Sequence, residues 1–159
     1  MLKTQRVILM NEKKTSALDN ILKSATLKDF EKIAKNEIQE GVPSLSNYLE
    51  NYLAAHSLDK GTVIKESLLS RDYAYAIFNG NRANPTRDRV LALCLAMHMS
   101  LDETQRTLKL ANVGALYSKN PRDAVIIIAF NTGKYNVGEL NDFLHAHGQE
   151  IIKTFDEKR

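Results

Sequence analysis

The chain has 159 residues, of which 43% are hydrophobic and 26% are charged, and its formal net charge is +3. This length suffices for one ordinary domain with a buried core, and the composition is that of a folded protein, which excludes an intrinsically disordered chain. The longest apolar runs, residues 90–97 and 125–130, are far shorter than the ~20 residues that a membrane-spanning helix needs.

Residues 1–6 contain no long apolar core and precede no small-residue cleavage site, so we expect no signal peptide and no membrane association. The single cysteine, Cys94, lies inside an apolar run, and we interpret it as a buried core thiol rather than a reactive one. Seven glycines and three prolines leave little material for tight turns, which favours helices over a many-stranded sheet. We therefore expect a cytoplasmic, all-helical protein.

Residues 1–43 are predicted to form an N-terminal helical extension. Its clearest helix begins near Leu27 and carries apolar residues at positions 27, 30, 33, 34 and 38, a spacing typical of an apolar stripe on one helical face. Gly41 and Pro43 end this pattern and mark a domain boundary.

Residues 44–112 are predicted to form the main domain. Apolar residues in 44–56 recur at the spacing of an amphipathic helix, and a shorter helix follows at about 59–66. Ser70 is a typical N-cap, so the next helix is expected to begin after it, and Gly80 closes that helix as a glycine does at the first position beyond a helix end.

Residues 113–159 are predicted to form a C-terminal helical hairpin and tail, because 120–148 repeat the pattern of 86–112. The shared positions, at offsets of 35 or 36 residues, are Arg87, Asp88 and Val90 with Arg122, Asp123 and Val125; Ser100 and Glu103 with Asn136 and Glu139; and Leu108 with Leu144. Two amphipathic hairpins can also resemble each other by chance, and in either case helix packs on helix. The run 125–130 is apolar almost all round, which predicts burial by its own hairpin packed against the main domain, by a second subunit, or by both.

The most informative stretch is residues 58–85. A short helix, a turn and a second helix are followed there by Asn79-Gly80-Asn81-Arg82 and Asn84-Pro85. Over residues 44–112 this order of features resembles the Cro and lambda-repressor-like (XRE-type) helix-turn-helix family. The resemblance implies an all-α fold: a lambda-repressor-like helix-turn-helix bundle with an N-terminal helical extension and a C-terminal helical hairpin.

When Gly80 is aligned with the glycine that closes the family's recognition helix, Lys60 falls near the start of the first motif helix and Ser70–Asn79 fall on the recognition helix. Two positions depart from the family's pattern. The family usually has alanine where this chain has Ile64, and glycine where it has Leu68. A leucine in a left-handed turn is strained by about 1–2 kcal/mol, so the turn is expected to differ from the family's.

At about 100° per residue, Ala74, Ile77 and Phe78 should face the core, which leaves the opposite face for base edges in the major groove. On this face we expect Arg71 to donate to guanine, Asp72 to accept from cytosine and Ala76 to contact a thymine methyl group. Three basic residues are expected to bind phosphates: Lys60, Arg82 and Arg87. The candidate DNA-binding residues are Lys60, Ser70, Arg71, Asp72, Tyr73, Tyr75, Ala76, Asn79, Arg82 and Arg87.

Each of these residues also has a structural interpretation. Tyr73 and Tyr75 suit packing as well as base reading, and Asp72 suits a solvated helix cap. Arg87 suits an ion pair with Asp88 or a nearby glutamate. The arginines at 71, 82, 87 and 89 form either a DNA-facing cluster or a solvated rim.

Other chemistry is sparse. His145 and His147 are two positions apart on a predicted helix and diverge, so they make a poor metal pair. We find no phosphate-binding glycine loop and no nucleophile–base pair, so we expect no enzyme activity, no metal and no cofactor. The leading hypothesis is a transcriptional regulator that binds double-stranded operator DNA as a homodimer. The alternative is a helical module that binds a protein partner without DNA.

Overall fold

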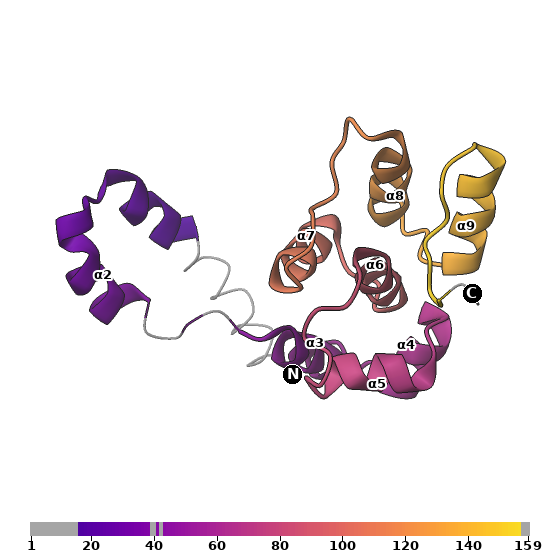
Figure 1. The fold of residues 1–159 in the computed structure, drawn as a ribbon, viewed down its shortest axis with the longest axis horizontal. Coiled ribbons are helices and arrows are strands. Elements are labelled where there is room, and N and C mark those ends of the chain that lie inside the picture. Colours follow the sequence, from indigo (N-terminus) through magenta and orange to yellow (C-terminus); the bar gives the residue numbers. More distant parts are fainter. Residues whose placement is uncertain (1–15, 39–40, 42, 157–159) are drawn as a thin grey trace. The chain divides into compact units, whose positions relative to one another are not determined.

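The computed structural model describes residues 16–38, 41 and 43–156. It separates the chain into two compact units, Met1–Pro43 and Ser44–Arg159, and every regular element in the described residues is helical (Figure 1). None of the helices described has both the length and the apolar composition to cross a membrane.

The first unit contains a helix over 16–24, a 3-10 turn η1 (Leu27–Asp29) and α2 (Phe30–Glu37). Asp29 caps this turn by accepting hydrogen bonds from the amide and the hydroxyl of Thr26, both at 2.8 Å. The predicted apolar stripe is present, but Leu27 and Phe30 on it are exposed.

Over residues 44–156 the second unit contains seven helices: α3 (Leu45–Ala55), α4 (Lys60–Ser67), α5 (Arg71–Phe78), α6 (Arg87–Ala96), α7 (Leu101–Leu110), α8 (Pro121–Asn131) and α9 (Val137–Ala146). Polar side chains set most of their starts. Ser44, Asp59, Ser70, Ser100, Asn120 and Asn136 each accept a hydrogen bond from the backbone amide three residues later. Such caps satisfy amides that have no partner inside the helix.

Helix α6 is the centre of this unit. Figure 1 shows it between α3–α5 on one side and α7–α9 on the other, and it contacts α4, α7 and α9. Every residue from Arg89 to Met97 is buried as a result. Cys94 is fully buried, and burial raises the pKa of its thiol to about 12, which confirms the interpretation of a core thiol.

The hairpins α6–α7 and α8–α9 are matched in detail. The side-chain amide of Gln105 bonds both backbone groups of Leu116, at 2.8 and 3.0 Å. The side-chain amide of Asn141, 36 residues later, bonds both backbone groups of Ile152 in the same way, at 2.7 and 3.0 Å. Shared apolar spacing alone would not reproduce these polar contacts, so the similarity of the two segments is structural.

Crossed ion pairs join the two hairpins at the starts of α6 and α8. Arg87 donates to both carboxylate oxygens of Asp123, at 3.0 and 2.7 Å, and Arg122 donates to Asp88 at 2.9 Å. Each arginine also donates to two carbonyls that follow its own hairpin: Gly114 and Ala115 for Arg87, Glu150 and Ile151 for Arg122. Because each hairpin pairs with the other in the same way, the two are related by an approximate two-fold axis.

The apolar run at 125–130 is buried only in part. Ile126, Ala129 and Phe130 lie in the core, whereas Ile128 on the same helix is 61% exposed. Helices α7 and α9 contact α8 and leave the side of α8 that carries Ile128 open.

Candidate nucleic-acid interface

Helices α4 and α5 are joined by a three-residue turn. Leu68 closes α4 in the left-handed conformation, with φ 60° and ψ 11°. The strain of a left-handed leucine was expected to change this turn, but the leucine adopts the left-handed backbone all the same. The hydroxyl of Ser67 donates to the carbonyl of Ile64 at 2.7 Å and accepts from the amide of Leu69 at 3.2 Å. These bonds hold the turn, while the side chain of Leu68 is 49% exposed.

Helix α5 has one buried and one exposed face. Ser70 accepts a hydrogen bond from the amide of Tyr73 at 3.3 Å, which confirms it as the N-cap. Ala74, Ile77 and Phe78 are at most 2% exposed, so the predicted inner face is confirmed. The outer face carries the polar and charged side chains of α5.

The outer face is formed by exposed Arg71, Asp72, Tyr75 and Asn79 around the half-buried Ala76. The guanidinium of Arg71 lies 5.5 Å from the centre of the Tyr75 ring, one helical turn later. Asn79 accepts a hydrogen bond from the amide of Asn81 at 2.9 Å, so its carbonyl oxygen supports the following loop.

Gly80 begins that loop with φ +84°, a conformation that side chains other than glycine's rarely adopt. A Cβ at this position would also lie 3.3 Å from the Ser46 hydroxyl oxygen. The chain then returns toward α5, where the amide of Arg82 donates to the carbonyl of Ala76 at 2.8 Å. This bond places Arg82 beside the exposed face.

Tyr73 packs between two arginines instead of reaching outward. The guanidinium carbons of Arg82 and Arg89 lie 4.3 and 4.0 Å from its ring centre. Its hydroxyl accepts from the amide of Thr86 at 3.4 Å. Arg89, which is 7% exposed, also pairs with Asp156 at 2.6 Å. Tyr73 is therefore a packing residue that links α5, α6 and the tail.

Arg87 was expected at the phosphates, and the structure places it elsewhere. Its Nε, Nη1 and Nη2 atoms all donate, to Asp123 and to the two carbonyls that follow α7. Burial would raise the pKa of Asp123, but hydrogen bonds from Arg87 and from the Tyr117 amide, with the nearby positive charges, hold that pKa below its usual range. Arg87 is thus an internal structural residue, and its partner is Asp123, 36 residues away along the chain, instead of a neighbouring acidic residue.

Lys60 occupies the first position of α4. Its ammonium forms an ion pair with Glu50 of α3 and lies 5.2 Å from the centre of the Phe78 ring. The carboxylate of Glu50 neutralises this charge and opposes a phosphate at the same position.

The four-arginine cluster is divided by the fold. Arg71 and Arg82 are exposed, whereas Arg87 and Arg89 hold carboxylates of the C-terminal hairpin and tail. The sequence did contain a signal for one of these pairs, because Arg-Asp occurs at the same place in both predicted hairpins. Sequence analysis missed that the two copies pair crosswise.

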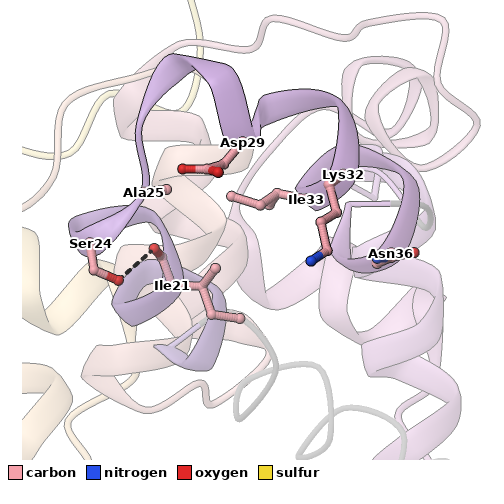
Figure 2. Close-up of a pocket in the computed structure, with 7 residues that line it drawn as sticks. All are labelled: Ile21, Ser24, Ala25, Asp29, Lys32, Ile33 and Asn36. Atoms are coloured by element: carbon pink, nitrogen blue, oxygen red, sulfur yellow. Dashed lines mark hydrogen bonds between the residues drawn. The ribbon is translucent and has the colours of Figure 1, made fainter.

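Two hollows lie outside this face. One, of about 340 Å³, is in the first unit (Figure 2). Its carboxylate, Asp29, already accepts from Thr26, and Ser24 donates to the carbonyl of Ile21 at 3.2 Å. The other, of about 560 Å³, includes Leu68 and the ring of His98, which stacks on Tyr135 at 4.5 Å. Within the described residues no group of histidine, cysteine or acidic side chains is arranged to hold a metal.

No protein-family model, curated protein or solved structure matches this chain. A functional assignment therefore depends on the chemistry of the exposed residues.

Proposed function

We propose that the chain is a DNA-binding transcriptional regulator of the Cro and lambda-repressor-like type, with α4 and α5 as its helix-turn-helix. In this proposal a dimer binds operator DNA, and each copy inserts the outer face of α5 into the major groove. The observation that carries the proposal is the two-faced character of α5: its inner side is buried in the core, while its outer side offers polar and charged groups within one short helix.

The outer face supplies chemistry that matches base edges. Arg71 in the first turn of α5 suits the two acceptors of guanine, and Asp72 beside it suits the amino group of cytosine. Ala76 leaves room for the methyl group of thymine at the middle of the helix. Residues in the first turns of a recognition helix are those that contact bases in this class of motif.

Arg82 is the best-placed phosphate contact. It is exposed, and its guanidinium lies over the Tyr73 ring, which restricts where the long side chain goes. Arg87 no longer belongs to this set, and Lys60 is paired with Glu50. A single copy therefore has few free positive charges for DNA, which favours binding as a dimer to two half-sites about one helical turn apart.

A salt series of binding to random duplex DNA tests the proposal. The logarithm of affinity should fall linearly with the logarithm of salt concentration, at about −0.9 per phosphate contact. Arg82→Ala should flatten the slope by about one unit. Lys109→Ala removes one exposed charge from α7 as a matched control and should leave the slope unchanged. Equal slopes for the parent chain and Arg82→Ala would remove Arg82 from the interface.

Base reading is tested separately on a selected DNA site. Ala76→Gln should weaken binding to that site by about 1–3 kcal/mol at one base pair and leave binding to random DNA unchanged. Its effect on folding stability should be under about 0.5 kcal/mol, because this half-buried position lies on the outer face of α5, away from the core. An Ala76→Gln variant that keeps full affinity for the selected site would contradict the proposed reading face.

A second candidate function is a protein-binding module on the same helices. It is favoured by the exposed apolar groups beside the turn: Leu68 is 49% exposed and borders a hollow of about 560 Å³, and Tyr75 is 37% exposed. Exposed apolar groups that cluster often mark protein contacts. This function would be favoured over the first if Leu68→Ser lost the capture of a protein partner while Arg82→Ala bound DNA as the parent chain does.

A further inference from the structure

The hairpin of α8 and α9 carries a row of side chains that are exposed, apart from the half-buried Val125, and whose counterparts in the hairpin of α6 and α7 are covered. We call this row the tail stripe. Its six residues lie on the two helices or at their ends: Val125, Ile128, Thr132, Glu139, Phe143 and His147. At offsets of 35 and 36 residues the counterparts are Val90, Leu93, Met97, Glu103, Thr107 and Ala111.

The counterparts are buried by the rest of the main domain. All but Glu103 are at most 1% exposed, and α4 contacts α6 while α3 contacts α7. Glu103 itself accepts a hydrogen bond from the Tyr52 hydroxyl of α3 at 2.9 Å. In the first hairpin, therefore, helices fill this face.

Among the described residues no helix fills the same face of the second hairpin. Ile128 is 61% exposed and Phe143 is 50% exposed. Phe143 stacks on His147, at 4.0 Å between ring centres, so the end of the stripe is ordered by side-chain contacts within α9. An isoleucine and a phenylalanine that are this exposed, on a face that the fold covers elsewhere, indicate a surface that binds another protein surface.

We infer that the tail stripe is the surface through which two copies of this chain associate. The inference rests on the proposed function only for the expectation of a dimer. The α8 part of the stripe has no charged residue between Ala124 and Thr132, so this part brings no charge into a contact between two copies. On α9, Glu139 and His147 stand at opposite ends with Phe143 between them.

A two-fold axis near Phe143 makes this stripe complementary to itself. Such an axis pairs the two α9 helices antiparallel, so that Glu139 of one copy faces His147 of the other instead of a second carboxylate. The antiparallel arrangement also opposes the helix dipoles favourably. A partner with an acidic stripe would lack this match, which is why we commit to a second copy.

The size of the face predicts a weak dimer. Helix α8 has 11 residues and is about 16 Å long, and two adjacent helices are about 20 Å wide, so the face covers roughly 330 Å². Stable interfaces bury about 800 Å² on each partner, so we expect a dissociation constant on the order of 10 µM. Figure 1 shows α8 on the side of α6 away from α5, whereas Glu139 at the start of α9 borders the same hollow as Leu68.

Sedimentation of the full chain without DNA, over about 1 to 200 µM, tests the inference. The parent chain should shift from monomer to dimer across this range. Ile128→Asp and Phe143→Asp should each raise the dissociation constant at least about tenfold, with melting temperatures unchanged because both side chains are already exposed. Tyr117→Asp is the matched control, since Tyr117 is 59% exposed but lies outside the stripe, and it should dimerise like the parent.

Cross-linking gives a second readout if a charged variant folds poorly. Phe143→Cys should form an intermolecular disulfide under mild oxidant faster than Tyr117→Cys, and the native Cys94 does not interfere because it is fully buried. A monomeric parent chain over the whole range, a dimer that survives both aspartates, or equal cross-linking rates at the two positions would each overturn the inference. None of these measurements uses DNA, so such a result leaves the proposed function to the salt series.

Discussion

Removal of Asp123 is the sharpest test of the link between the two hairpins. Its side chain is 7% exposed and accepts both bonds from Arg87, which is 26% exposed, as well as one from the Tyr117 amide at 2.9 Å. Loss of one partner of a buried ion pair costs about 3–5 kcal/mol, because the other charge stays buried alone. Arg87 keeps its bonds to the Gly114 and Ala115 carbonyls. We therefore expect Asp123→Ala to cost about 3 kcal/mol, the lower end of that range.

Urea denaturation measures this cost. With a slope of about 2 kcal/mol per molar, a loss of 3 kcal/mol lowers the midpoint by roughly 1.5 M. Asp88→Ala is the matched variant from the other hairpin, because Asp88 accepts one bond from Arg122 at 2.9 Å and one from the Lys153 amide at 3.0 Å. Its side chain is 21% exposed, so its loss should cost less, about 1–2 kcal/mol.

A double-mutant cycle over Arg87 and Asp123 then isolates their interaction. The two single losses should add to clearly more than the loss in the double variant, with a coupling of at least about 1 kcal/mol. A cost below about 1 kcal/mol for Asp123→Ala, or an equal or larger cost for Asp88→Ala, would refute the argument that burial and two-point contact make the first pair the stronger one.

Two further predictions concern protonation and the end of α5. Because the folded-state pKa of Asp123 lies below its usual value near 3.8, the pair should stabilise the protein fully above about pH 5 and lose this contribution as the pH falls through the folded-state pKa. The urea midpoint should therefore fall less steeply between pH 7 and about pH 2 in Asp123→Asn than in the parent chain. Parallel curves of midpoint against pH would contradict the lowered pKa of Asp123. Gly80→Ala should lower the free energy of unfolding by about 1–2 kcal/mol because alanine is strained in the left-handed backbone, and by a further amount because its Cβ contacts Ser46. Gly148 also has a left-handed backbone, with φ +68°, but has open space around it. Gly148→Ala should therefore show only the loss from the backbone. Thermal melts of both variants check this order, which equal losses would contradict.

Local chemistry made several features of this protein predictable from the sequence. The start of α5 follows from Ser70, which bonds an amide three residues later, and its end follows from Gly80, which adopts the left-handed backbone. The inner face of α5 follows from helical periodicity, as the burial of Ala74 and Ile77 confirms. These features depend on contacts within one helical turn, which a sequence displays directly.

The roles of the arginines could not be read in this way. Arg71 and Arg87 stand in similar first turns, one of α5 and one of α6. Only the second finds a buried carboxylate, 36 residues away on α8, and Arg89 finds Asp156, 67 residues away. An ion pair depends on distance in space. The repeated Arg-Asp marks equivalent places in the two hairpins, but the spacing of charges along the chain does not show which side chains the packing of the helices brings together.

The same limit applies to the apolar run on α8. The sequence alone determined that residues 125–130 would need cover, since nearly every face of that segment is apolar. Only the tertiary structure decided which face receives it: Ile126 turns into the hairpin core and is fully buried, while Ile128 remains 61% exposed. Identical side chains two positions apart differ because burial is set by the neighbouring helices, and α8 has such neighbours on one side.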